Sequence, residues 1–175
     1  MKAFFIFMVL LISGMALMAQ TPGFKNISLT LPTVALVDIH PAGTITMNFS
    51  APTEAGNPLG NPTSNNAKWL NYTSAVAVGN TRTITASVNQ VIPGINIRLQ
   101  AGAAAGSGGG ARGTSAGLVT LSTTPATIIS GIGGAYTGDG INNGHQLTLS
   151  LVSGTYANII AQSYSVTITY TISGL

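Results

Sequence analysis

The chain has 175 residues, with six Lys and Arg against three Asp and Glu, two His and no Cys. Charged residues make up 5% of the chain, where about 25% is usual, and the basic ones form no run or stripe. This pattern excludes an electrostatic nucleic-acid-binding surface, and the lack of Cys excludes disulfides. Thr, Ser, Asn and Gln must supply most of the polar surface, so neighbouring copies repel one another only weakly.

Residues 1–19 have the layout of a secretory signal peptide. Lys2 precedes an apolar run, and small residues permit cleavage between Ala19 and Gln20. The run is shorter than the roughly 18 apolar residues of a membrane span, so a permanent anchor is the less favoured alternative. We expect residues 20–175 to form a single exported domain without a membrane span. Its expected location is the extracellular space or the cell surface, reached through the periplasm.

The rest of the chain has the pattern of successive short strands. Apolar and polar residues alternate, β-branched residues are frequent, and Gly, Pro and Asn mark the turns, as is typical of half-buried antiparallel strands. The expected strands are 26–31, 33–39, 44–49, 69–78, 83–88, 95–99, 119–121, 127–132, 147–151 and 164–172. This pattern predicts an all-β fold, an antiparallel β-sandwich of about eight to ten strands, with a barrel as the second choice.

The last expected strand is the most regular. Its apolar side is formed by Tyr164, Val166, Ile168, Tyr170 and Ile172, and its polar side by Ser and Thr alone. We expect this strand to close the sheet beside an internal partner.

Two segments are expected to be loops. Residues 51–67 contain three Pro, two Gly and four Asn, which disfavour a helix or a central strand. Residues 102–113 are rich in Gly and Ala, and 108–113 match the pattern G-x-G-x-x-G. A dinucleotide site would require a helix starting in this loop. A strand is expected to follow instead, so we interpret 102–113 as a mobile connection.

Candidate catalytic or metal-binding residues are few. Asp38 and His40 are two apart, so they share one face of a strand, and His145 is the second imidazole. Residues 113–117, GTSAG, match G-x-S-x-G, but a nucleophile elbow needs a helix directly after the serine, and a strand is expected to follow there instead. The sequence after Asp139 lacks the ligand spacing and flanking helices of an EF-hand, and we expect a polar turn there. The sequence therefore predicts no enzyme activity, no catalytic residue, no cofactor and no metal.

A sugar-binding platform is the alternative to a purely structural role. Trp69 and Tyr72, with Tyr136 and Tyr156 as further candidates, offer aromatic faces on which sugar rings could stack. The competing interpretation is that a single Trp on a strand fills the core. Glycans are thus the alternative partner.

The last third of the chain resembles the spore coat protein U family. Gly154-Thr155-Tyr156 precede the alternating segment Val166 to Tyr170, as at the end of that family's members. That family and the chaperone–usher pilins are small secreted bacterial β-sandwiches of the immunoglobulin-like type. The resemblance therefore implies an immunoglobulin-like sandwich that serves as a structural surface subunit.

The resemblance also implies assembly with copies of itself or with related surface subunits, into a pilus, coat or matrix. In pilin-type subunits, the N-terminal extension of a neighbour completes the sandwich as an added strand. The alternating residues Ile27, Leu29 and Leu31 follow the expected cleavage site and are the candidate donor strand. Two features depart from the pilin pattern: there is no Cys pair, and Tyr170 lies further from the C-terminus than a pilin's near-terminal aromatic.

Overall fold

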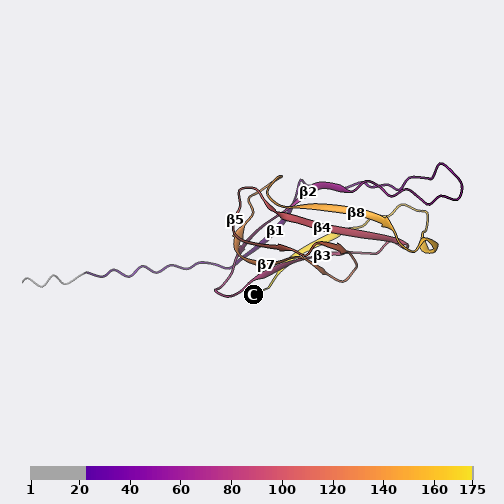
Figure 1. The fold of residues 1–175 in the computed structure, drawn as a ribbon. Helices are drawn as coiled ribbons and strands as arrows, with labels where there is room; N and C mark the ends of the chain where they lie inside the picture. Colours follow the sequence, from indigo (N-terminus) through magenta and orange to yellow (C-terminus); the bar gives the residue numbers. More distant parts are fainter. Residues whose placement is uncertain (1–22, 175) are drawn as a thin grey trace, which may run out of the picture. The chain divides into compact units, whose positions relative to one another are not determined.

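The computed structural model describes residues 23–174, so the predicted signal peptide, with its cleavage site at Ala19 and Gln20, lies outside the described residues. The chain divides into two units, Met1–Leu31 and Pro32–Leu175. The second unit contains all nine strands of the described chain (Figure 1). They are β1 (Val34–His40), β2 (Asn65–Ala75), β3 (Arg82–Val88), β4 (Ile95–Ala105), β5 (Gly109–Ser115), β6 (Leu118–Thr120), β7 (Ala126–Tyr136), β8 (Gly144–Ser153) and β9 (Ile168–Ser173), with a short 3-10 turn at Tyr156–Asn158.

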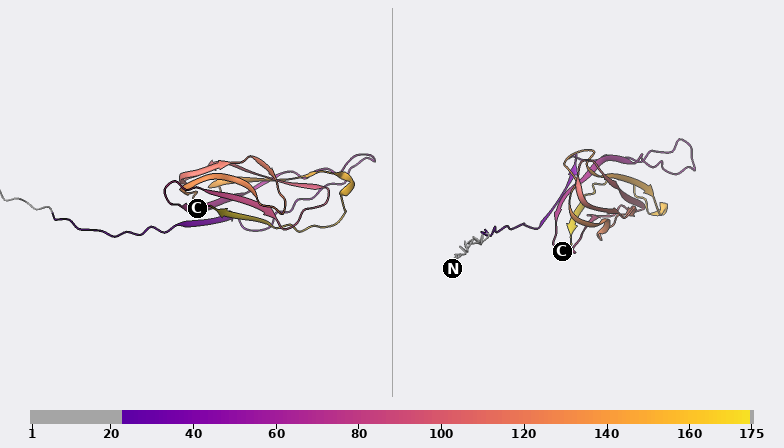
Figure 2. Two further views of the ribbon diagram at one scale, coloured as in Figure 1. Left: turned by 90° about the horizontal axis from the view of Figure 1, so that it is seen from below. Right: turned by 60° about the vertical axis from the view of Figure 1, so that its left-hand side comes forward.

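The strands form one antiparallel sheet in the order β6-β4-β8-β2-β7-β3-β9, to which β1 is added beside β2 and β5 beside β7. β2 changes partner along its length, because its first half pairs with β8 and its end, at Thr73 and Ser74, pairs with β7. β4 packs against β5 and β7, and β1 packs against β9, although these pairs share no ladder. The sheet therefore curves strongly over its own concave face (Figure 2).

A single hydrophobic core fills this concave face. Alternate residues of β3 are buried, which is the period of a strand with one covered face. The core is formed by Leu70, Tyr72, Ile84, Ala86, Val88, Ile97, Leu99, Ala101, Leu121, Ile128, Ile129, Ile132, Ala135 and Leu147. The predicted all-β, antiparallel fold is confirmed, whereas the immunoglobulin-like sandwich stays a prediction.

Two expected strands are not strands in the structure, namely 26–31 and 44–49. In the second segment Ile45, Met47 and Phe49 are half-buried while the residues between them are exposed. Only one isolated bridge follows, between Ser50 and Gly60. The alternation therefore reflects packing on one side, and the ladder is missing because the described chain places no partner strand beside this segment.

The predicted loop at 102–113 is wrong, because β4 continues through Ala105 and β5 begins at Gly109. Gly110 and Gly113 have positive φ angles of 81° and 72°, which only Gly adopts readily. A side chain at Gly110 would collide with the carbonyl oxygen of Gly134 on β7. The glycines thus permit an irregular strand in close contact with β7, where composition alone suggested a loop.

No helix among residues 23–174 has the length and apolar character needed to cross a membrane.

Candidate functional site

The two strands β1 and β9 lie against each other and each has an edge without a partner strand. β9 pairs with β3 and β1 pairs with β2, and no other described strand pairs with either of them. Their apolar side chains, with Val166 just before β9, contact the core but remain half-exposed: Val37, Ile39, Val166, Ile168, Tyr170 and Ile172. A half-covered apolar row beside an unpaired strand edge is the geometry that accepts an added strand.

The C-terminal strand is shorter than expected. β9 begins at Ile168, so Tyr164 and Val166 precede it, although both keep the half-buried state of the alternating pattern. Its partner β3 is internal to the sheet, with Tyr170 opposite Ala86. The expected position beside an internal strand is therefore the observed one, and the other edge of β9 is the open one.

The candidate donor residues lie in the first unit, not in the sheet. Ile27, Leu29 and Leu31 are 89%, 77% and 80% exposed, and the described segment that contains them forms no strand. Isolated exposed apolar residues are common on soluble proteins. Three in strict alternation within six residues are the pattern of a strand whose covered face still lacks its partner.

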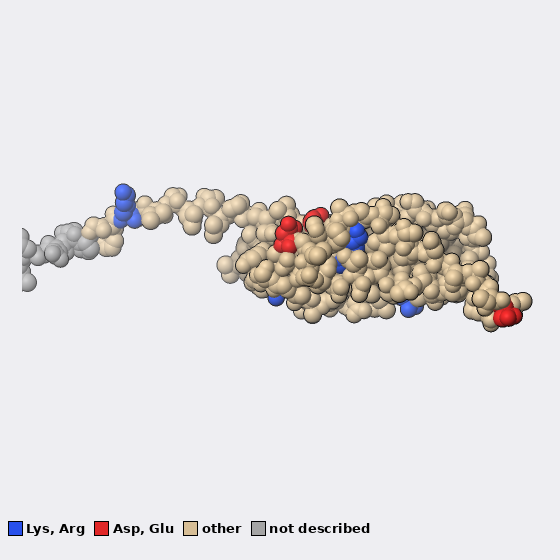
Figure 3. Space-filling view, turned by 90° about the horizontal axis from the view of Figure 1, so that it is seen from above, with Lys and Arg blue, Asp and Glu red and all other residues tan. Residues whose placement is uncertain are grey.

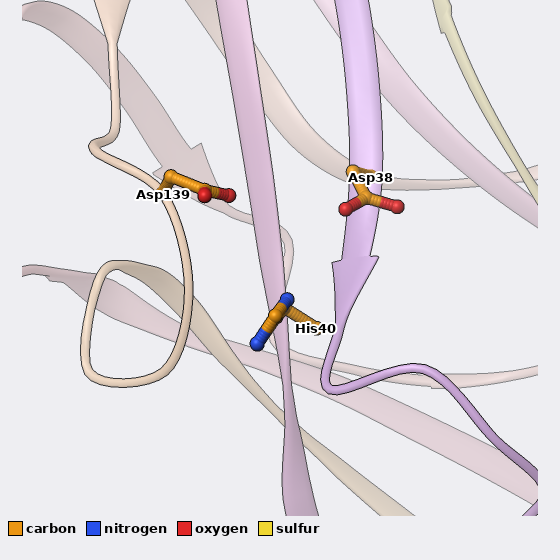
Figure 4. Close-up of side chains that lie close together, drawn as sticks. All are labelled: Asp38, His40 and Asp139. Atoms are coloured by element: carbon orange, nitrogen blue, oxygen red, sulfur yellow. The ribbon is translucent and has the colours of Figure 1, made fainter.

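A second feature lies on the outer face of β1 and β2. Asp38 and His40 project from β1 on the side away from the core, and Asp139 comes from the loop after β7 (Figure 4). The carboxylate and imidazole donor atoms of these three residues all lie within 4.8 Å of one another. We call these three residues the acid–imidazole cluster. The spacing of Asp38 and His40 predicted their shared face, but no local signal linked Asp139 to them.

Asn71 holds the Asp139 loop next to β1. It lies directly opposite Asp38 in the ladder of β1 and β2 and is 5% exposed. Its side-chain amide donates to Asn143 O at 2.7 Å, and its Oδ1 accepts a hydrogen bond from Gly140 N at 2.9 Å. The polar turn expected after Asp139 is therefore fixed to the sheet at both of its ends.

A shallow pocket of about 290 Å³ adjoins the cluster. Asp38 and Asp139 form part of its wall, together with the exposed apolar side chains of Leu36 and Tyr136. Leu36 and Tyr136 both lie opposite Thr73 of β2, one on each side. Any group bound by the cluster would therefore have one side open to this pocket.

Two of the chain's three carboxylate side chains are in the cluster, and charged side chains are few on the face shown in Figure 3. Three of the cationic side chains donate hydrogen bonds to backbone carbonyl oxygens. Lys68 donates to Pro41 O at 2.6 Å and to Gly43 O at 2.8 Å. Arg82 donates to Gly174 O at 2.6 Å, and Arg112 donates to Ala105 O at 2.9 Å. Two carboxylates held this close repel each other unless a cation joins them.

The other imidazole, that of His145, lies in the protein interior. His145 is 0% exposed. Its Nδ1 lies 2.8 Å from Gly102 O, which can only accept, so this nitrogen carries a proton. Its Nε2 lies 3.0 Å from the Tyr72 hydroxyl oxygen, and the same hydroxyl contacts Arg112 O, so the single hydroxyl proton lies between these two partners. Both ring nitrogens are therefore occupied, and sequence reasoning did not predict this buried network.

The same network removes Tyr72 from the predicted sugar platform. Tyr72 is 3% exposed and belongs to the core. Trp69 is three residues away on the same strand, so it lies on the opposite face, where it is half-buried opposite His40. The two rings cannot stack on one sugar, because β2 lies between them.

Comparisons of the chain with protein-family models, with curated proteins and with solved structures found no significant match.

Proposed function

We propose that the chain is an exported, non-catalytic structural or surface subunit that assembles with copies of itself by strand addition. In this proposal, residues 26–31 of one copy form a strand along the open edge of β9 in another. The product would be a filament, coat or extracellular matrix, since in this proposal each copy supplies one donor segment and accepts one at the open edge of β9.

The observation that carries the proposal is the match between the two apolar rows. Ile27, Leu29 and Leu31 alternate with polar residues and are exposed, and the row of β9 beside its open edge is only half-covered. Joining the two would bury apolar surface on both and supply hydrogen-bond partners to the edge strand. The very low charge of the chain supports the same conclusion, because little repulsion opposes association.

Glycan binding is the weaker alternative. It would have to rely on Trp69 without Tyr72, because Tyr72 is in the core. A single half-buried indole offers a small stacking surface, and we therefore favour assembly.

A pair of neighbouring substitutions tests the proposal. Leu29→Asp places a charge on the apolar side of the donor segment, whereas Thr30→Asp places the same charge on its polar side. In analytical ultracentrifugation of the chain without its predicted signal peptide, we expect concentration-dependent oligomers for the wild type and Thr30→Asp. We expect Leu29→Asp to remain monomeric, because a carboxylate would be buried in the added strand.

Either of two results would contradict the proposal: a wild-type protein that stays monomeric at all concentrations, or a Leu29→Asp variant that assembles like the wild type. A synthetic peptide of residues 23–31 provides an independent check, since it should occupy the acceptor edge and stop the growth of wild-type oligomers.

A further inference from the structure

We propose that the acid–imidazole cluster of Asp38, His40 and Asp139 binds a divalent first-row transition metal ion, with Zn²⁺ as the ion of choice. The site is distinct from the strand edge used in the proposed assembly, because its side chains lie on the outer face of β1 and β2.

The donor set determines the class of metal. Imidazole nitrogen and carboxylate oxygen are both ligands of Zn²⁺, whereas Ca²⁺ and Mg²⁺ prefer oxygen ligands alone. His40 is the imidazole available for this purpose, because both nitrogens of His145 are already hydrogen-bonded. A cation would also remove the repulsion between Asp38 and Asp139, whose carboxylates are held close together.

The geometry requires only a small adjustment. Two ligand atoms bound to one tetrahedral Zn²⁺ at about 2.0–2.1 Å lie about 3.3–3.4 Å apart. The donor atoms in the cluster lie within 4.8 Å of one another, so rotation of the exposed Asp38 and Asp139 side chains and of the half-buried His40 can close the difference. The backbone need not move, since β1 is in the sheet and Asn71 fixes the loop that carries Asp139.

The metal would join two distant parts of the chain. Asp38 and His40 are on the edge strand β1, and Asp139 follows β7. Because these residues meet only in the folded chain, a metal bound to all three would stabilise the folded state over the unfolded one. This chain has no Cys and therefore no disulfide, so a bound metal would take the place of a disulfide in linking these distant segments. The coordination position left open by three protein ligands would face the pocket beside Leu36 and Tyr136.

Thermal unfolding with and without metal tests the site. The tag-free chain without its predicted signal peptide is measured after EDTA treatment and dialysis, alone and with Zn²⁺ or Ca²⁺. At free Zn²⁺ about one hundred times its Kd, we expect Tm to rise by about 5–10 °C. Ca²⁺ at the same concentration should raise it far less. Asp38→Asn, His40→Gln and Asp139→Asn should each abolish most of the shift, while Glu54→Gln, which changes the third carboxylate, should not.

Trp69 supplies a readout specific to this location. It is the only Trp in the chain and lies opposite His40 in the ladder of β1 and β2. Co²⁺ bound at the cluster should quench its fluorescence in the wild type and in Glu54→Gln but not in His40→Gln. The proposal is overturned if millimolar Zn²⁺ leaves the wild-type Tm unchanged, if Ca²⁺ acts as strongly as Zn²⁺, or if folded cluster variants respond like the wild type.

Discussion

At the scale of single residues, Asn71 connects the sheet with the loop that completes the outer-face cluster. Its side chain makes both of its hydrogen bonds to backbone groups of that loop, at Gly140 and Asn143. Asn71 is 5% exposed, so water can replace these bonds poorly.

Replacing Asn71 by Ala should lower the free energy of unfolding by about 1–3 kcal/mol, because two part-buried backbone groups lose their partners. The same change at Asn66, which is exposed on the same strand, should have little effect. Urea denaturation followed by circular dichroism measures both. Equal losses in the two variants would mean that Asn71 does not anchor the loop.

At the scale of secondary-structure elements, β5 depends on glycines at defined positions. Gly113 has a φ of 72°, and a Cβ atom there would lie 2.6 Å from Ser130 O and 2.8 Å from Ile132 Cγ1. Gly134 of β7 has open space where its Cβ would be. A side chain is therefore excluded at Gly113 but fits at Gly134, although both glycines lie in the same pair of strands.

Gly113→Ala should destabilise the protein by about 1–3 kcal/mol through backbone strain, with the steric clash adding to this. Gly134→Ala should change stability by about 0.5 kcal/mol or less. Denaturant unfolding of the two variants provides the measurement. A Gly113→Ala variant as stable as Gly134→Ala would show that β5 does not pack on β7 in this way.

These elements also show what the sequence could and could not predict. Alternation predicted β1, β3 and β9 because it reports a strand with one covered face. It failed at 44–49, since one-sided packing does not require a ladder, and it missed β5, whose Gly-rich sequence resembles a loop. For the acid–imidazole cluster, the sequence predicted that Asp38 and His40 share one face of a strand. It could not predict Asp139, because only the fold brings that residue to them.

At the scale of the whole molecule, Tyr72 in the core and the half-buried Tyr170 should make the free energy of unfolding depend on pH in the alkaline range. Burial raises the pKa of Tyr72 to about 12, an effect that the positive charge of Arg112 partly offsets, and burial raises the pKa of Tyr170 to about 12. In the unfolded chain a tyrosine ionises near its ordinary pKa of 10.0. Between these pH values the unfolded state has lost protons that the folded state retains.

The free energy of unfolding should therefore be unaffected by these two groups below pH 10, and it should fall as the pH rises from about 10 to about 12. Urea denaturation at several pH values measures this decrease. Tyr170→Phe keeps the ring but removes one of the two groups, so its decrease should be shallower. Parallel curves for the wild type and Tyr170→Phe would rule out a contribution from Tyr170.

The assembled state would give partners to residues 26–31 and to the open edge of β9. Residues 26–31 form no strand in the single chain, and the outer edge of β9 has no described neighbour. Strand addition would convert both into parts of one ladder, with their backbone N–H groups newly protected from solvent.

Residue-resolved hydrogen–deuterium exchange on wild-type oligomers and on Leu29→Asp monomers measures this most directly. Strand addition predicts slow exchange for the amides of residues 26–31 and along β9 in the oligomers, and fast exchange for residues 26–31 in the variant. Oligomers in which residues 26–31 exchange as fast as in the monomeric variant would contradict it.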